Sequence, residues 1–170
     1  ATIKSILSDK NKNKNGFVYS TYVKGSGSIL FASILGLFGF TKATGQENTP
    51  GLRYALINNE TSNNKDIRKI IDRFNKPDNM TGKFIKVIIG SQVIGEGFTL
   101  KNIQFIDILT GHWNYSETSQ VIARGWRLGS HSDLIKANKN PSVDIYQRVS
   151  LPENDCKSIN LELYETSETK

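Results

Sequence analysis

The chain has 170 residues, of which 37% are hydrophobic and 22% are charged, and these proportions are typical of one ordinary globular domain. The longest apolar run, residues 29–40, is shorter than the roughly 20 residues that a membrane-spanning helix needs, so we expect no membrane partner. The single cysteine, Cys156, excludes an internal disulfide. Because no cluster of cysteines and histidines occurs either, the sequence predicts an intracellular domain, not a secreted one, with no metal site.

Positive charge is concentrated in the first part of the chain. The net charge is +6, and residues 153–170 contain five acidic and two basic residues, so the preceding residues carry nine net positive charges. This excess favours a polyanionic partner, although a solvated lysine-rich surface gives the same count. The chain begins with alanine and its only methionine is Met80, which suggests a fragment or a processed product.

The chain starts with a polar segment, residues 1–15, and the composition of residues 9–15 predicts a loop or a disordered start. After it, segments of two hydrophobic patterns alternate. Short runs rich in β-branched and aromatic residues predict strands at residues 16–20, 53–57, 84–90, 103–109 and 143–150. Longer apolar or amphipathic runs predict helices at residues 27–40, 64–75 and 117–128. Segments rich in glycine, proline and asparagine predict loops at residues 42–51, 75–82 and 136–141.

Five strands separated by helices or long connections imply βαβ units, and therefore an α/β fold whose parallel sheet is covered by helices on both faces. We assign residues 16–151 to this domain. Residues 152–170 form an acidic tail, which we expect to pack loosely or to await a partner. Ligands of such sheets bind at the carboxyl ends of the strands, so the loops after Ser20, Gly90 and Leu109 are candidate sites.

The predicted helix at residues 117–128 carries Gln120, Arg124 and Arg127 at positions i, i+4 and i+7, which places them on one face. Ile122 and Trp126 point elsewhere, and we expect them to pack the helix against the sheet. A polar face of this kind is more often a solvated surface than a catalytic one. The helix alone therefore leaves both interpretations open.

The segment SQVIGEGFTL, residues 91–100, follows a predicted strand. Gly95 and Gly97 allow the backbone to approach a ligand closely, and its N–H groups suit phosphate or ribose oxygens. The alternative is a glycine-rich turn without a ligand. A strand, this turn, a second strand and a Gln/Arg helix in that order are a much less common combination.

This order resembles the second RecA-like domain of superfamily-two helicases. GFVYSTYV at residues 16–23 looks like their motif IV region, SQVIGEGFTL looks like motif V, and QVIARGWR at residues 120–127 looks like motif VI, usually written QxxGRxxR. The resemblance covers about residues 14–134. It implies a RecA-like parallel sheet with helices on both faces.

The match is closer to one branch, the helicase-like nucleoside triphosphatases of large cytoplasmic DNA viruses. RFNKPDNMTGKFIKVIIGS at residues 73–91, HWN at 112–114 and RLGSH at 127–131 are similar to that branch. It includes the poxvirus nucleoside triphosphate phosphohydrolase and the small subunit of the poxvirus early transcription factor.

Two departures from the family pattern matter. Ala123 stands where the family usually has glycine, a change between small residues that we expect to keep the helix close to its neighbours. The chain also contains no GxxxxGK[ST] phosphate loop, and no DE pair follows a strand. The resemblance therefore implies that ATP and Mg²⁺ are bound mainly by an N-terminal RecA-like domain elsewhere in the parent chain, and that the isolated domain is inactive.

The resemblance also implies roles for individual residues. Arg127 would be an arginine finger, and Arg124 its companion at the γ-phosphate. The other nucleotide-binding candidates are Gln120, Gly95, Glu96 and Gly97. The nucleic-acid-binding candidates are Ser20, Thr21, Ser91, Gln92, Trp113 and Asn114. Contacts of the first four to a nucleic-acid backbone would carry no sequence information. A structural role in the core is the favoured alternative for Trp113.

The implied partners are the N-terminal RecA-like domain, DNA or RNA, and viral RNA polymerase or transcription factors. The implied location is the host cytoplasm, in the viral factory, or the virion. One alternative function belongs to a different class. In it, the chain is a non-catalytic nucleic-acid-binding or scaffold module that keeps the RecA-like fold.

Overall fold

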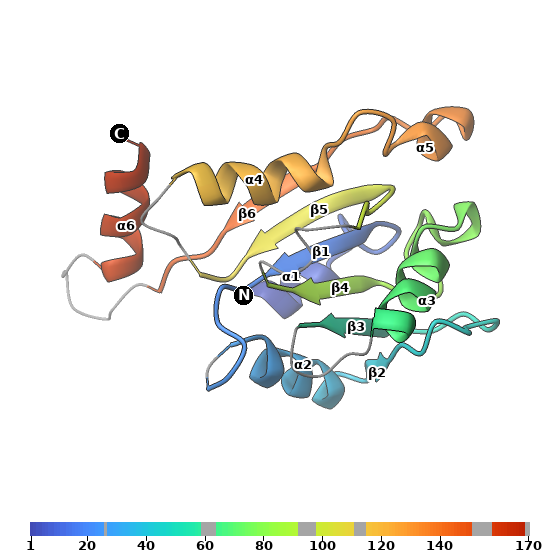
Figure 1. Ribbon diagram of the computed structural model, residues 1–170, viewed down its shortest axis with the longest axis horizontal. Helices are drawn as coiled ribbons and strands as arrows, with labels where there is room; N and C mark the ends of the chain where they lie inside the picture. The colour runs from blue at the N-terminus through green and yellow to red at the C-terminus, as the bar shows by residue number, and fades with distance from the viewer. Residues whose placement is uncertain (26, 59–63, 92–97, 111–114, 151–157, 169–170) are drawn as a thin grey trace.

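The computed structural model describes residues 1–168 except 26, 59–63, 92–97, 111–114 and 151–157, and Figure 1 shows its arrangement. Within this part of the chain, six strands form one parallel sheet in the order β2-β3-β4-β1-β5-β6. The strands are β1 (Asn15–Tyr19), β2 (Thr41–Lys42), β3 (Arg53–Ile57), β4 (Val87–Gly90), β5 (Ile103–Ile108) and β6 (Asp144–Gln147). The helices are α1 (Thr2–Leu7), α2 (Ser28–Leu37), α3 (Asn64–Phe74), η1 (Pro77–Asn79), α4 (Tyr115–Gly125), α5 (Ser132–Lys136) and α6 (Ile159–Glu168).

Helices cover both faces of the sheet, as predicted. On one face, α3 and α4 pack on the inward side chains of the strands. On the other face, α1 and α2 pack on the remaining strand side chains. The central strands β1, β4 and β5 are buried along their whole length, because a parallel sheet with two covered faces leaves no solvent-facing side. The predicted α/β fold is therefore confirmed.

Five of the described elements lie where the prediction has no helix or strand. One of them is η1, a single turn inside the predicted loop at 75–82. The strand β2 occupies the border of the predicted loop at 42–51, and its two residues are too few to produce a periodic pattern. Neither α1 nor α5 was predicted, and both are shorter than the usual helix signal. The expectation of a loosely packed tail is wrong for Ile159–Glu168, which forms α6.

The polar start of the chain is held by one buried lysine. Lys86, just before β4, is only 2% exposed. Its ammonium group donates to the main-chain carbonyls of Asn11, Lys12 and Lys14, the last two at 2.8 and 2.5 Å. Burial, and next the nearby charge of Lys14, lower the pKa of Lys86 to about 8. Residues 9–14 are therefore packed turns, which explains why a run of lysine and asparagine leads directly into β1.

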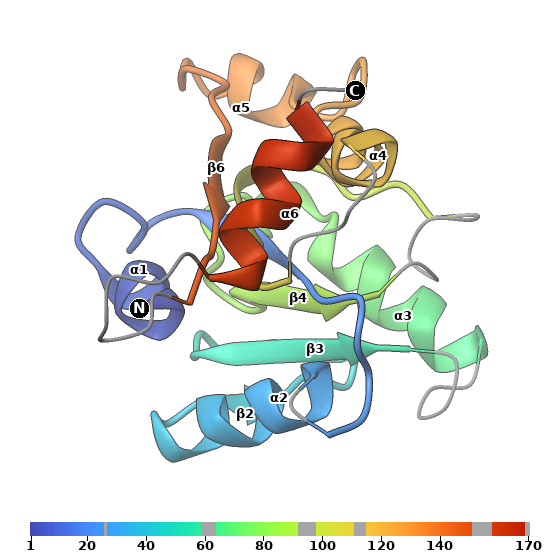
Figure 2. The same ribbon diagram turned by 90° about the vertical axis from the view of Figure 1, so that its left-hand side faces the viewer.

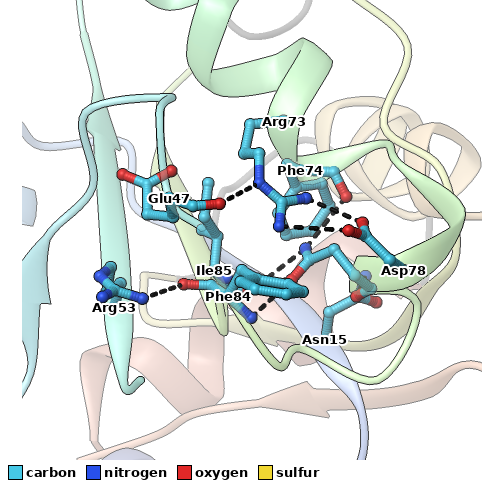
Figure 3. A network of polar contacts seen from close by, with 9 residues as sticks. Asn15, Glu47, Arg53, Arg73, Phe74, Asp78, Phe84 and Ile85 are labelled. Carbon is cyan, nitrogen blue, oxygen red and sulfur yellow. Dashed lines mark hydrogen bonds and ion pairs between the residues drawn. The ribbon is translucent and has the colours of Figure 1, made fainter. Parts of the chain in front are cut away.

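A second polar network joins the end of α3 to the chain that enters β4 (Figure 3). Arg73 is 5% exposed, and its Nε donates to the Glu47 carbonyl at 2.7 Å. Its Nη1 donates to the Asp78 carboxylate at 2.8 Å, and the guanidinium stacks on the Phe84 ring at 3.9 Å. The network ties the end of α3 to the 75–86 connection, which leads into β4.

The C-terminal helix lies at the edge of the sheet toward which the strands point (Figure 1). Figure 2, which looks from that side, shows α6 beside α4. Tyr164 and Ser167 of α6 are buried, with exposed fractions of 7% and 3%. None of the described helices is both long and apolar enough to cross a membrane.

Candidate arginine site and nucleic-acid interface

Helix α4 ends earlier than predicted, and this changes the position of Arg127. The last helical hydrogen bond runs from the Trp126 N–H to the Ile122 carbonyl at 3.2 Å. The chain then turns through Gly129, whose φ of 79° lies in the left-handed region that favours glycine. Gln120 and Arg124 thus lie on the helix, whereas Arg127 lies in the turn after it. The expectation that all three share one helical face is wrong for Arg127.

Arg127 is exposed, and its guanidinium contacts the chain that leads into β5. The Nη1 group donates to the Thr99 hydroxyl at 3.2 Å. The Thr99 carbonyl in turn accepts a hydrogen bond from the Asn75 side chain at 2.8 Å, and Asn75 also accepts from the Lys101 N–H at 2.7 Å. The end of α3, the entry to β5 and the turn after α4 therefore meet at Arg127.

Close packing of α4 on the sheet depends on Gly125. A Cβ atom built on Gly125 would lie 2.4 Å from Ile106 Cδ1, far inside van der Waals contact. Ala123 is exposed and lines a surface hollow. The small residue that brings the helix close to its neighbours is therefore Gly125, and the expectation for Ala123 is wrong.

Arg124 lies near the end of β1. Burial raises the pKa of Tyr19, the charge of Glu117 adds to the rise, and the charge of Arg124 opposes it. The Tyr19 hydroxyl donates to Glu117 at 3.5 Å, a distance at the outer limit for a hydrogen bond. Gln120 is exposed.

Trp126 does not pack against the sheet, contrary to the sequence-based expectation. It is 54% exposed, and the neighbouring Leu128 is fully exposed. Trp126 lines a hollow of about 600 Å³ with Ile122, Val143 and Ile145. It also lines a second hollow of about 450 Å³, whose walls include Arg127 and Leu128. Arg127 therefore lies on the rim of an exposed apolar surface.

The carboxyl ends of β1, β4 and β5 are adjacent in the sheet, and a group of hydroxyl side chains follows them. The Ser20 N–H donates to the Gly90 carbonyl at 3.1 Å, which brings Ser20 next to Ser91. The Thr21 N–H donates to the Thr110 hydroxyl at 3.0 Å, and that hydroxyl donates to Thr21 Oγ1 at 3.2 Å. The half-buried Thr21 side chain also forms a hydrogen bond with Tyr19, which opposes the rise in the pKa of Tyr19.

The other two members of this group are less accessible. Ser20 is 1% exposed, and its hydroxyl donates to the Tyr22 carbonyl at 2.9 Å. Ser91 is 6% exposed. The remaining sequence-predicted residues lie outside the described part of the chain: Gln92, Gly95, Glu96, Gly97, Trp113 and Asn114.

Comparison with known proteins identifies the family of this chain. Residues 1–129 match the family model described as the helicase conserved C-terminal domain. The chain belongs to this family. The sheet, with motif-bearing segments after β1, β4 and β5, is thus the RecA-like sheet of a helicase C-terminal domain.

Several relatives of this helicase C-terminal domain are viral proteins. It is 48% identical to protein 087L of Invertebrate iridescent virus 3 over 95% of this chain and 17% of the relative. It is 44% identical to protein 009L of Frog virus 3 over 91% of this chain and 16% of the relative. Both relatives carry names that describe them as candidate helicases. Nucleoside triphosphatase I of Heliothis armigera entomopoxvirus is 31% identical over 84% of this chain and 21% of the relative. The chain thus spans about a sixth to a fifth of the length of these relatives.

Solved structures share the fold. The C-terminal part of the Fun30 ATPase domain superposes with a TM-score of 0.66 at 17% identity, over 98% of this chain and 42% of that one. The T4 protein UvsW gives a TM-score of 0.57 at 13% identity, over 99% of this chain and 30% of that one.

The helicase C-terminal domain offers groups that fit part of a nucleoside triphosphate. Arginine guanidinium groups match phosphate oxygens in geometry and charge, and Arg127 presents one at the surface. Magnesium would need oxygen ligands such as carboxylates, and the described residues contain no cluster of three or more His, Cys, Asp or Glu side chains that could hold a metal ion.

Sequence reasoning missed three residues that the fold brings to these sites: Thr99 and Asn75 beside Arg127, and Thr110 beside Thr21. Thr99 lies in the SQVIGEGFTL segment, and Thr110 follows the strand whose carboxyl end was a candidate site, so both carried a signal. Asn75 carried none, because it comes near Arg127 only through the packing of α3.

Proposed function

We propose that this helicase C-terminal domain is the second motor domain of an NTP-dependent helicase or translocase. In this function, Arg127 stabilises the phosphates of a nucleotide that an N-terminal RecA-like domain of the same parent chain holds. The observation that carries the proposal is an exposed guanidinium on a turn that is packed against β5. Among the described residues the guanidinium donates to Thr99, and a guanidinium carries five N–H donors in a fork that suits phosphate oxygens.

The chemistry of phosphoryl transfer explains why such an arginine is useful. Negative charge spreads over the γ-phosphate oxygens in the transition state, and catalysis there consists mainly of positioning and charge stabilisation. An arginine from a neighbouring domain can raise the rate by about 10³- to 10⁵-fold. Because Arg127 then completes the site only when two domains meet, hydrolysis would be coupled to domain closure.

The surroundings of Arg127 support a domain contact at this place. Trp126 and Leu128 are exposed on either side of it, and Ile135 in the same hollow is 60% exposed. Exposed apolar patches of this kind mark interaction surfaces. A partner domain that receives Arg127 would bury these side chains at the same time.

The carboxyl edge of the sheet supports contacts to a nucleic-acid backbone, whether DNA or RNA. Thr21 is half-buried, whereas Ser20 and Ser91 are buried, so Thr21 is the described hydroxyl residue that we assign to a phosphate oxygen. A contact of this type does not depend on base sequence, which suits a motor that moves along any sequence. As the motif resemblance implies, we extend the proposal to a role in viral transcription or replication, beside viral RNA polymerase or transcription factors. The parent chain would then lie in the viral factory of the host cytoplasm or in the virion, which immunofluorescence in infected cells tests.

The test of Arg127 is Arg127→Ala in a parent chain that contains both RecA-like domains. We expect kcat for nucleic-acid-stimulated hydrolysis to fall by about 10³-fold or more, with little change in KM, because the interaction forms mainly in the transition state. Arg127→Lys should recover little activity, since a point charge cannot reproduce the planar fork. Arg68→Ala, at an exposed arginine of α3, is the matched control and should retain normal turnover. Normal turnover of Arg127→Ala would instead favour the non-catalytic binding or scaffold function.

A further inference from the structure

We infer that Ser130 and His131 are positioning residues for Arg127, which they hold by its main-chain carbonyl; this inference rests on the proposed function. Although the Arg127 side chain is exposed, its carbonyl oxygen is firmly bound. It accepts hydrogen bonds from the Ser130 N–H at 2.9 Å and from the Ser130 hydroxyl at 2.6 Å. Ser130 is only 2% exposed, so water competes little for these contacts.

His131 connects Ser130 to the core. Its Nδ1 lies 2.9 Å from the Ser130 hydroxyl, and its Nε2 lies 2.6 Å from the Ile103 carbonyl. Because a carbonyl oxygen can only accept, Nε2 carries a proton, and a neutral imidazole then accepts at Nδ1. The single Ser130 hydroxyl proton is therefore shared between Nδ1 and the Arg127 carbonyl. His131 is 6% exposed and Ile103 is fully buried. A continuous series of polar contacts thus runs from the first residue of β5 to the carbonyl of Arg127, which the Ser130 N–H holds whichever way the hydroxyl donates.

A second set of contacts fixes the same turn from the other side. The Asn102 N–H donates to the Ser130 carbonyl at 2.8 Å, and the Asn102 side chain donates to Asp133 of α5 at 2.9 Å. The ring of Trp126 packs on the ring of His131, with centroids 5.0 Å apart. The turn can therefore shift little relative to β5 without breaking several buried contacts.

Such rigidity has a chemical consequence for Arg127. Its guanidinium is at the end of a long side chain that the described residues hold at one point, the Thr99 hydroxyl. The direction in which it leaves the domain is then set mainly by its backbone. Since a displacement of about 1 Å at a catalytic group can cost about a hundredfold in rate, a fixed backbone at Arg127 is expected to matter for turnover.

The experiment compares Ser130→Ala and Ser132→Ala in the two-domain parent chain. Ser130→Ala removes the hydroxyl that lies between His131 and the Arg127 carbonyl, whereas Ser132 is a half-buried neighbour whose side chain plays no part in this series of contacts. We expect Ser130→Ala to lower kcat by about ten- to a hundredfold with little change in KM, and Ser132→Ala to leave both unchanged. The double variant Arg127→Ala/Ser130→Ala should be no slower than Arg127→Ala alone, because Ser130 acts through Arg127.

A readout without nucleotide completes the test. Hydrogen–deuterium exchange of residues 126–132 should be at least about tenfold faster in Ser130→Ala, since its backbone bonds open more often. His131→Gln is the second variant: its amide can still donate to Ile103, but the contact of Nδ1 with Ser130 is lost. It should show the same kcat loss and the same faster exchange.

The outcomes separate this inference from the proposed function. Normal turnover of Arg127→Ala overturns the proposed function, whatever Ser130→Ala does. An impaired Arg127→Ala together with a Ser130→Ala that behaves like Ser132→Ala overturns the positioning role alone. An additive loss in the double variant, or global unfolding of both Ser130→Ala and His131→Gln, also overturns it, because these residues would then support the fold and not Arg127.

Discussion

The buried ion pair between Asp107 and Arg148 is expected to hold the edge strand β6 in place. Asp107, on β5, is 0% exposed, and it accepts hydrogen bonds from Arg148 Nε at 2.9 and 3.1 Å and from Nη2 at 2.5 Å. The Thr2 hydroxyl of α1 donates to the same carboxylate at 3.3 Å. The hydrogen bonds to Asp107 are the main cause that raises the pKa of Arg148, so the pair favours the charged guanidinium.

The perturbation is Arg148→Met, which keeps a long apolar stem beside the Tyr146 ring but leaves the Asp107 carboxylate buried without its cation. Removing one partner of a buried pair costs about 3–5 kcal/mol. The Arg148 side chain is 25% exposed, so water relieves part of this cost and we expect about 3 kcal/mol. For a domain of this size, that loss lowers Tm by about 6–12 °C.

Urea unfolding followed by circular dichroism measures this effect. Lys69→Met is the matched control, because the Lys69–Asp66 pair on α3 is exposed on both sides and such pairs contribute at most about 1 kcal/mol. Asp107→Asn/Arg148→Met should recover much of the loss, since the buried charge is then absent. If Arg148→Met unfolds at the same urea concentration as the unmodified chain, or if the double variant recovers nothing, the pair does not hold β6.

Three further predictions follow from single contacts. Burial, with the charge of Asp107 as a second cause, raises the pKa of Tyr164 to about 12, so the stabilisation from its neutral form is complete below about pH 10 and is lost as pH rises toward 12. Urea unfolding between pH 9 and 11 should show this loss in the unmodified chain and not in Tyr164→Phe. Gly125→Ala should lower the free energy of unfolding by about 1–3 kcal/mol, because the added methyl group overpacks against Ile106. Gly36→Ala, at a helical glycine with open space around it, should raise it by up to about 1 kcal/mol. Equal melting temperatures of the two variants would contradict the packing argument. Arg73→Lys should cost about 2 kcal/mol in urea unfolding, because lysine cannot bond Glu47 and Asp78 together while stacking on Phe84, and a change below about 0.5 kcal/mol, typical of a surface position, would refute this role.

Local patterns were sufficient for the architecture of this domain. The strand predicted at residues 53–57 coincides with β3, and the predicted helix at 64–75 corresponds to α3, whose Ile67, Ile70, Ile71 and Phe74 are buried. Both predictions succeed because the periodic pattern of buried side chains depends on residues that are close together in the sequence. The two edge features, β2 and the end of β6, were missed or misplaced because short strands that are partly exposed carry little periodicity.

The amino-acid sequence by itself determined the α/β class, the helicase resemblance and the choice of Arg124 and Arg127, since these depend on residue types at fixed spacings. Only the tertiary structure decided that Arg127 lies beyond the end of α4, that Trp126 faces outward, and that Gly125 makes the close contact. It also brought Thr99 and His131 to the arginine turn and Lys86 to the turns before β1. These features depend on contacts between residues far apart in the chain, whose free energies decide where a helix stops and which side of it is covered, and no local pattern records them.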